Sequence, residues 1–299
     1  MRDSRLPSLT ALVVACARGV ANVSAGSKAP VEAIADRLVP APIGALMRAA
    51  QRAAGRSMHL DRALRAGSLG LVDHVTLRTA AIDSVVVSCA ERVAQLVILG
   101  AGLDARAWRM PQLAAATVFE IDHPSTQAYK RARTAGARSR ARKVTFVGVD
   151  FERDDLGVRL AASGHDSALP TMWIWEGVTP YLTPEALAGT LDVIGERSSP
   201  GSVLAMTYGT PDLVDGFRLL HPLVRPAFRL LGEPLEGLIE SSAAMRLVRA
   251  RGFEVEDDSG APDWAARVGA RRPPVVVAER LLVAEVRASS GRAASPGRC

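Results

Sequence analysis

The chain has 299 residues, with 37 Lys and Arg against 31 Asp and Glu, 48% hydrophobic residues and 4% aromatic residues. This length is enough to bury the core of one large α/β domain, or of two smaller ones, without metals or disulfides. The balance of apolar and charged residues excludes a disordered or collagen-like chain.

Cysteine content and hydropathy favour a cytoplasmic protein without a membrane span. Cys16, Cys89 and Cys299 lie far apart and form no C-x-x-C pair, so they indicate neither a disulfide framework nor a zinc cluster. No stretch approaches the roughly 18 uncharged apolar residues of a membrane helix. The apolar stretch at 9–17 is short and Arg18 follows it at once, so we expect no signal peptide.

The net charge of +6 arises from two segments, and the rest of the chain is acidic. Ten basic residues lie within 130–143 or in the tail 287–299: Lys130, Arg131, Arg133, Arg138, Arg140, Arg142, Lys143, Arg287, Arg292 and Arg298. The tail has no apolar period and is predicted to be disordered. The segment 130–143 contains no aromatic residue to stack on bases, so we expect a solvated helix end and loop and no nucleic-acid partner.

Residues 1–90 are predicted to form an N-terminal helical cap region, which prolines and glycines interrupt twice. Its last helix is expected from about Asp73 to Gln95. The apolar residues that recur there at helical spacing on one face are Leu77, Ala81, Val85 and Cys89.

Residues 91–286 are predicted to form the core domain. Continuous apolar runs, typical of strands buried on both faces, recur at intervals that leave room for crossover helices. They are 96–99, 117–122, 144–150, 171–176 and 202–208, followed by a strand pair at 253–256 and 275–286 in which Glu279–Arg280 marks a bend or hairpin. The alternation predicts an α/β fold with a doubly wound parallel sheet.

The segment 210–251 is too long for a simple loop between two strands. It carries apolar residues at helical spacing between Phe217 and Leu231. We expect a helical lid insertion that caps the site.

The turn after the first strand reads Leu-Gly-Ala-Gly-Leu-Asp-Ala at 99–105, which fits the nucleotide-binding pattern G-x-G-x-x-A through Gly100 and Gly102. By itself this pattern is weak. Asp104 lies inside the turn, where a carboxylate would repel the pyrophosphate of NAD but suit the sulfonium and ammonium groups of S-adenosyl-L-methionine. The charge therefore favours the methyl donor.

Acidic residues end the predicted parallel strands, and the carboxyl ends of such strands meet in one crevice. Asp122 lies 22 residues after Gly100, the distance expected for an acid that accepts hydrogen bonds from ribose hydroxyls. Asp150 and Phe151 could take the adenine amino group and cover the ring face. Glu176 would lie next to the reacting end of the ligand, where it could hold the donor or orient the acceptor.

Arg78 is the one basic residue in the apolar part of its predicted helix, and a buried arginine requires an anion. The methionine carboxylate of the donor is one candidate, and a structural bridge to Asp83 is the other. The five histidines show no zinc-ligand or Ser-His-Asp spacing, and no phosphate loop is present, so we expect no metal.

Four segments resemble the leucine carboxyl methyltransferase-like group of class I methyltransferases. They read Leu-Gly-Ala-Gly-Leu-Asp-Ala-Arg-Ala-Trp-Arg at 99–109, Phe-Glu-Ile-Asp-His-Pro at 119–124, Val-Asp-Phe-Glu-Arg-Asp-Asp-Leu at 149–156 and Trp-Glu-Gly-Val-Thr-Pro-Tyr-Leu at 175–182. Ala105 departs from the group, in which Thr is frequent at this position.

The resemblance implies a mostly parallel, seven-stranded, Rossmann-like methyltransferase sheet. It also implies that the methionine carboxylate lies on Arg78, the donor against the glycine turn and near Glu176, the ribose on Asp122, and the adenine near Asp150 and Phe151.

We therefore expect an O-methyltransferase that uses S-adenosyl-L-methionine and modifies a hydroxyl or carboxyl group of a small molecule. An NAD-dependent oxidoreductase and a non-catalytic nucleotide-binding module remain alternatives. A carboxylate acceptor would need no general base, and a hydroxyl acceptor would need one. The sequence offers only loose candidates for such a base: His123, Tyr181, Tyr208 and His221.

Overall fold

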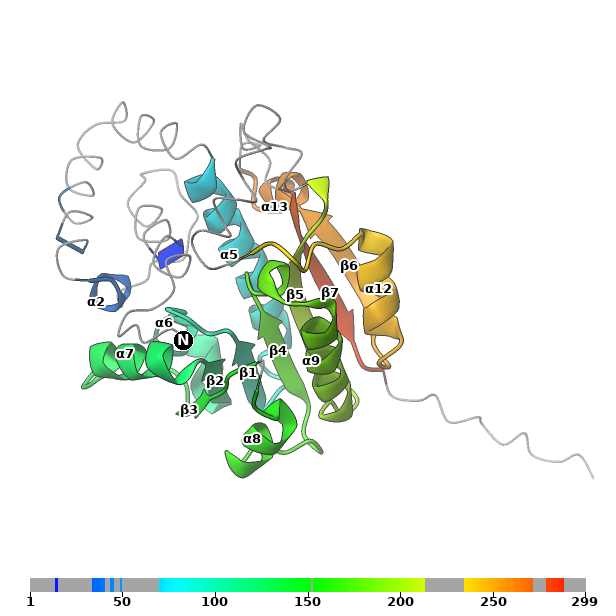
Figure 1. Cartoon of the computed structure of the whole chain (residues 1–299). Helices are drawn as coiled ribbons and strands as arrows, with labels where there is room; N and C mark the ends of the chain where they lie inside the picture. The colour runs from blue at the N-terminus through cyan, green and yellow to red at the C-terminus, as the bar shows by residue number, and fades with distance from the viewer. Residues whose placement is uncertain are drawn as a thin grey trace, which may run out of the picture.

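The computed structural model describes residues 14–15, 34–40, 44–45, 49, 70–151, 153–212, 234–270 and 278–287. Its centre is a seven-stranded sheet in the order β3-β2-β1-β4-β5-β7-β6 (Figure 1). The strands are β1 Gln95–Leu99, β2 Thr117–Asp122, β3 Lys143–Gly148, β4 Thr171–Trp175, β5 Val203–Gly209, β6 Glu254–Gly260 and β7 Glu279–Glu285.

Strands β1 to β5 pair in parallel, and β7 lies antiparallel between β5 and β6. The strand order reverses between β1 and β4, which are direct neighbours. The predicted doubly wound, mostly parallel, seven-stranded sheet is thus confirmed. In such sheets the crevice at the reversal point, beyond the carboxyl ends of the strands, is where ligands bind.

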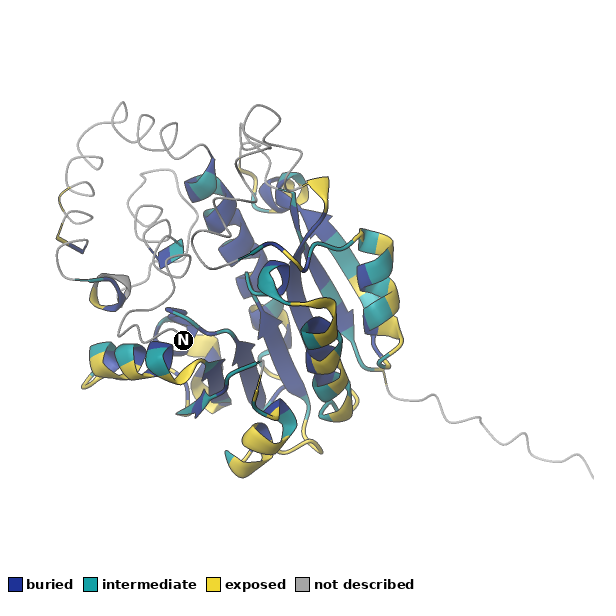
Figure 2. Ribbon diagram, in the orientation of Figure 1, coloured by how far each residue is buried: buried dark blue, intermediate teal, exposed yellow. Residues whose placement is uncertain are grey.

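Helices cover both faces of the sheet, as the buried and exposed stripes in Figure 2 show. All five residues of β1 and all five of β4 are buried, as expected for apolar runs without alternation. The helices whose bounds fall within the described ranges are α2 Ala35–Leu38, α5 Leu71–Cys89, α6 Arg106–Arg109, α7 Pro124–Thr134, α8 Leu156–Ala162, α9 Pro184–Glu196, α12 Ser241–Arg249 and α13 Ala261–Arg267, with 3₁₀ turns η1 Pro111–Ala115 and η2 Thr179–Tyr181.

One apolar cluster lies between the sheet and α5, α6 and α13, and a second lies between the sheet and α8, α9 and α12. Successive residues of β1 point into different clusters: Leu96 and Ile98 into the first, Val97 and Leu99 into the second. This alternation is the pleat of the strand.

Local capping explains where two helices begin. The Asp155 side chain accepts a hydrogen bond from the Val158 N–H at 2.9 Å and starts α8. The Thr183 hydroxyl accepts one from the Ala186 N–H at 3.2 Å, with Pro184 in the first turn of α9.

The predicted element boundaries at Gln95 and at Glu279–Arg280 are wrong. The helix expected to reach Gln95 ends at Cys89, because Gln95 is the first residue of β1 and pairs with β2 and β4. Glu279–Arg280 is not a bend. These residues begin β7 and pair with Gly209 and Tyr208 of β5.

The predicted lid at 210–251 needs correction in its last part. Helix α12 packs through Ala244 and Val248 into the second apolar cluster, so it is a crossover helix of the sheet rather than a lid. Residues 234–240 lie across the strand ends instead: the Gly237 N–H donates to the Pro180 carbonyl and the Ile239 N–H to the Gly209 carbonyl, both at 3.0 Å. The expected helical spacing between 217 and 231 lies outside the described residues.

Most of the N-terminal region 1–69 and the tail after Arg287 also lie outside the described residues. Arg287, which the sequence placed in the tail, forms ion pairs with Glu254 and Glu256. No helix in the described ranges is long and apolar enough to cross a membrane.

Candidate functional site

The glycine turn lies at the carboxyl end of β1, where the strand order reverses. Gly100 has φ +64° and Gly102 φ +45°, a backbone region that favours glycine. A Cβ atom on Gly100 would lie 2.2 Å from Val178 Cγ2, in the loop after β4. Both the conformation and the close approach therefore require glycine at position 100.

Asp122, the last residue of β2, connects this turn to the next strand. One carboxylate oxygen accepts a hydrogen bond from the Gly102 N–H at 2.6 Å, and the other accepts one from the His123 N–H at 2.7 Å. Burial raises the pKa of Asp122, and the two amides oppose that rise. The Thr126 side chain also hydrogen-bonds to the Asp122 carboxylate. Of the roughly four acceptor sites of a carboxylate, about one is then left for a ligand hydroxyl.

Asp150 and Phe151 follow β3 by two and three residues, because the strand ends at Gly148 rather than at 150 as predicted. The Val149 N–H donates to the Asp122 carbonyl at 2.9 Å, so this segment lies beside the end of β2. Both residues are half-buried, and Phe151 packs against the second apolar cluster. The three residues predicted to hold ribose and adenine thus come from neighbouring strand ends.

Glu176, directly after β4, lies between two guanidinium groups. Its Oε1 accepts from Arg78 Nε at 3.0 Å and its Oε2 from Arg106 Nη1 at 2.8 Å. The side chains of Glu176 and Arg78 are 6% and 7% exposed, so the ion pair is buried. The structure therefore brings these two predicted site residues into direct contact.

The alternative prediction for Arg78 is a structural ion pair with Asp83, and this ion pair does not form. Asp83 pairs instead with Arg106 and Arg109, at 2.8 and 2.7 Å. The second partner of Arg78 is Glu279, whose two carboxylate oxygens lie 3.0 and 2.8 Å from Nη1. Burial opposes the charge of Arg78, but Glu279 and then Glu176 outweigh it, so the pKa lies above its ordinary value.

Asp104 is 4% exposed and points inward. Its carboxylate accepts from the Arg106 backbone N–H at 2.7 Å and pairs with the guanidinium of the same residue. The charge of Asp104 is therefore compensated by Arg106, and the contact of Asp104 with the donor stays a prediction.

The sequence did not single out Arg106, Arg109, Glu279 or His74, which complete this cluster. Its four carboxylates, on Asp83, Asp104, Glu176 and Glu279, outnumber its three guanidinium groups by one. Glu279 also lies 2.6 Å from His74 Nε2. A signal existed only for Arg106, which follows the glycine turn directly.

Of the candidate general bases, Tyr208 is not available. It is fully buried on β5, and its hydroxyl is hydrogen-bonded to Ser241 and Asp258 at 2.9 Å each. Burial is the main cause that raises its pKa to about 12. His123 is exposed at the start of α7, Tyr181 is half-buried in η2, and His221 lies outside the described residues.

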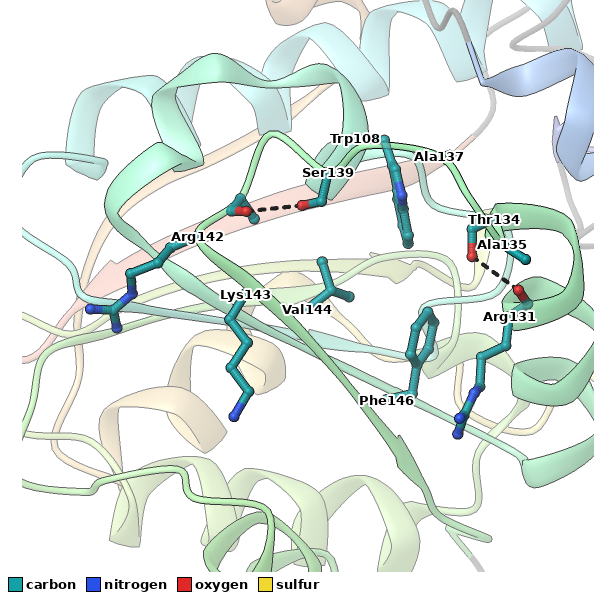
Figure 3. A pocket seen from close by; sticks show the side chains of 11 residues that line it. Trp108, Arg131, Thr134, Ala135, Ala137, Ser139, Arg142, Lys143, Val144 and Phe146 are labelled. Carbon is teal, nitrogen blue, oxygen red and sulfur yellow. Dashed lines mark hydrogen bonds between the residues drawn. The ribbon is translucent and has the colours of Figure 1, made fainter.

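A separate cavity of about 370 Å³ lies at the β3 edge of the sheet (Figure 3). Trp108, Val144 and Phe146 form apolar walls, and Arg131 and Lys143 also line it. None of the predicted site residues is among its lining within the described chain. No group of three or more metal-ligating side chains occurs in the described ranges either.

Comparison with known proteins gives matches along most of the chain. The sequence profile of the leucine carboxyl methyltransferase family matches residues 11–195. A predicted S-adenosyl-L-methionine-dependent methyltransferase of Streptomyces coelicolor is 37% identical over 160 residues, covering 52% of this chain and 56% of the relative. Another from Mycolicibacterium paratuberculosis is 45% identical over 119 residues, covering 39% and 37%. The chain thus spans about half the length of the curated relatives that it matches.

Two solved structures share the fold. A DUF574 family protein from Streptomyces avermitilis superimposes with a TM-score of 0.56 at 15% identity, over 93% of this chain and 97% of that one. A protein from Thermobifida fusca, described as a predicted methyltransferase, gives a TM-score of 0.52 at 16% identity, over 96% and 97%. At these identities the similarity shows a common fold alone.

Proposed function

The chain belongs to the leucine carboxyl methyltransferase family, and we propose that it transfers a methyl group from S-adenosyl-L-methionine to an oxygen atom of a small molecule. The oxygen would belong to a carboxyl or a hydroxyl group. The family supports the reaction class, and the residues at the strand ends support the choice of donor.

The observation that carries the proposal is the hydrogen bond between Asp122 and the glycine turn. It holds the carboxylate beside Gly102 at 2.6 Å, where an acceptor site remains for a ribose hydroxyl. The positive φ of Gly100 lets the backbone pass close to a ligand without a side chain in the way. Asp150 and Phe151, beside Asp122, would take the adenine.

Arg78 would hold the carboxylate of the donor's methionine group. Among the described residues its hydrogen bonds use Nε and Nη1, which leaves the donors on Nη2. A guanidinium binds a carboxylate through short, charge-assisted hydrogen bonds. Glu176, bonded to the same guanidinium, lies at the end of β4 next to the turn.

When bound, S-adenosyl-L-methionine supplies a methyl group on a positively charged sulfur, already activated for displacement. The contribution of the protein is then to hold donor and acceptor in line, and such orientation can account for much of the acceleration. A carboxylate acceptor would need no proton transfer. A hydroxyl acceptor would need a base, for which His123 and Tyr181 remain candidates after the exclusion of Tyr208.

A cytoplasmic location is part of the proposal. Cys89, the last residue of α5, is a buried free thiol, and burial raises its pKa to about 11, so it is poorly suited to disulfide exchange.

Isothermal titration with S-adenosyl-L-methionine, S-adenosylhomocysteine and NAD tests the proposal. We expect the wild-type protein to bind the first two and not NAD. Asp122→Ala should weaken both by roughly 10- to 100-fold, the loss expected for hydrogen bonds to a charged group. Asp155→Ala is the matched control and should bind like wild type. It also removes an acid that accepts a hydrogen bond from a backbone N–H, but this acid caps α8.

Tight NAD binding without binding of the sulfonium ligand would contradict the proposal and favour an oxidoreductase. Donor binding without turnover on any carboxyl or hydroxyl acceptor would favour a non-catalytic nucleotide-binding module.

A further inference from the structure

Glu279, the first residue of β7, lies where the antiparallel strand meets helix α5. Both of its carboxylate oxygens accept hydrogen bonds from Arg78 Nη1, at 3.0 and 2.8 Å. Its side chain is 8% exposed, so water does not replace these contacts. The two residues are 201 positions apart in the sequence.

His74 fixes Glu279 from the same helix. Its Nε2 lies 2.6 Å from Glu279 Oε2, and its ring packs against Trp264 of α13 with 5.7 Å between centroids. His74 and Arg78 are four residues apart, so they lie on one face of α5 and reach Glu279 together. Burial would raise the pKa of Glu279, but Arg78 and then His74 lower it to about 2, so the carboxylate stays charged.

Arg78 is therefore held by two carboxylates through two of its three nitrogens. Glu176 takes Nε and Glu279 takes Nη1. A Cβ on Gly177 would lie 3.7 Å from Nη2, in van der Waals contact, so glycine at this position adds no side-chain atom on that side of the nitrogen. The guanidinium of a free arginine would occupy many rotamers, and fixing it in advance lowers the entropic cost of binding a ligand.

We propose that Glu279 and His74 are positioning residues that hold Arg78 so that Nη2 faces the carboxylate of the donor's methionine group. The inference rests on the proposed function, because it assigns the anion that Arg78 would bind. It adds two residues that do not touch the donor themselves and act through Arg78.

A change at Glu279 has two opposing consequences for an anionic group bound at Arg78. Removal of the negative charge would strengthen the attraction between Arg78 and a ligand carboxylate. Loss of the hydrogen bonds would release the guanidinium from its fixed orientation. A positioning role requires that the second consequence is the larger.

The test compares two ligands in isothermal titration. S-adenosylhomocysteine carries the methionine-derived carboxylate, whereas 5′-methylthioadenosine keeps the adenosine and the thioether but lacks that carboxylate. We expect Glu279→Gln to weaken S-adenosylhomocysteine roughly tenfold or more, and to change the affinity for 5′-methylthioadenosine less than about twofold. Glu279→Asp keeps the charge but shortens the side chain, and should give a similar selective loss.

Glu285→Gln is the matched control, since it makes the same change on the same strand and removes a partly exposed pair with Arg92. It should bind both ligands like wild type. Equal losses of both ligands in the Glu279 variants, or tighter binding of S-adenosylhomocysteine by Glu279→Gln, would overturn the positioning role. Failure of the wild-type protein to bind either ligand would instead overturn the proposed function.

Discussion

The arginines at the carboxyl end of β1 and those at the β3 edge of the same sheet are stabilised in different ways. Arg78 and Arg106 are buried, and each pairs with two or more carboxylates. Arg131 and Arg142 are exposed and form no ion pair with any residue in the described ranges. Burial thus makes pairing obligatory, whereas water can solvate a cation at the surface.

At the β3 edge, a ring contact and a hydrogen bond to a hydroxyl take the place of ion pairs for the exposed arginines. Arg131 lies over the ring of Phe146, 5.7 Å from its centroid; both side chains are labelled in Figure 3. Arg142 donates to the Thr117 hydroxyl at 2.9 Å. Lys130 is the exception in this segment: it is 1% exposed and pairs with Glu120 at 2.7 Å, so it is not part of the solvated helix end that the sequence predicted. The net positive charge of the chain therefore says little about the site.

The largest effect should follow from removal of a buried cation. Arg106→Met keeps an apolar side chain of related size but leaves Asp83, Asp104 and Glu176 without one partner each. We expect the free energy of unfolding to fall by about 3–5 kcal/mol, because buried carboxylates lose their compensation. Urea denaturation measures this loss.

Arg142→Met makes the same change at the β3 edge and should alter stability by less than about 0.5 kcal/mol. Similar losses of unfolding free energy in the two variants would mean that the buried ion pairs of Arg106 contribute no more to stability than the exposed contacts of Arg142.

A second comparison uses two glycines with positive φ, one in each region. Gly100→Ala adds a Cβ 2.2 Å from Val178 Cγ2 at φ +64°, whereas Gly136→Ala adds one at φ +72° with no atom within 4 Å. The backbone cost is shared, at about 1 kcal/mol, and overpacking adds about 1–3 kcal/mol at Gly100 alone. We expect thermal unfolding to show the larger loss for Gly100→Ala.

Addition of Val178→Ala should recover the packing part of that loss and leave the backbone part. If the double variant is no more stable than Gly100→Ala, the close approach to Val178 is not the cause.

The sequence predicted the strands well, because buried parallel strands are continuous apolar runs that end at a glycine or an acidic residue. It also singled out Arg78, Asp122 and Glu176 as candidates, since each stands out locally as a charge at the end of an apolar segment or within one. The structure places Arg78 and Glu176 in direct contact and Asp122 against the glycine turn. The second partner of Arg78, Glu279, could not be found in this way. Glu279 meets Arg78 only because β7 inserts between β5 and β6, and no local pattern records that topology.

Asp104 illustrates a different limit. The sequence shows an acidic residue in the glycine turn, but it does not show that this carboxylate turns inward to pair with Arg106, two residues later. A sequence shows which residues are charged, but which opposite charges they pair with depends on how the chain packs.

The smallest expected effect concerns the buried imidazole of His165. Its charged hydrogen-bond partner is an arginine rather than a carboxylate. His165 is 4% exposed, and Arg197 Nε donates to its Nδ1 at 3.2 Å. Burial lowers the pKa of His165 from 6.5 to about 4, and the positive charge of Arg197 adds to this effect. The core thus avoids an uncompensated charge here by keeping the imidazole neutral.

The unfolded chain takes up a proton at His165 near pH 6.5, whereas the folded protein resists until about pH 4. Stability should therefore fall as the pH drops through this window, and His165 should contribute about 1–2 kcal/mol of the loss between pH 7.5 and 5. His165→Gln, which cannot be protonated, isolates that share when urea denaturation is repeated along the pH series. Stability curves that stay parallel for the variant and the wild type would mean that the imidazole is as easily protonated in the core as in water, and that burial beside an arginine does not exclude its charge.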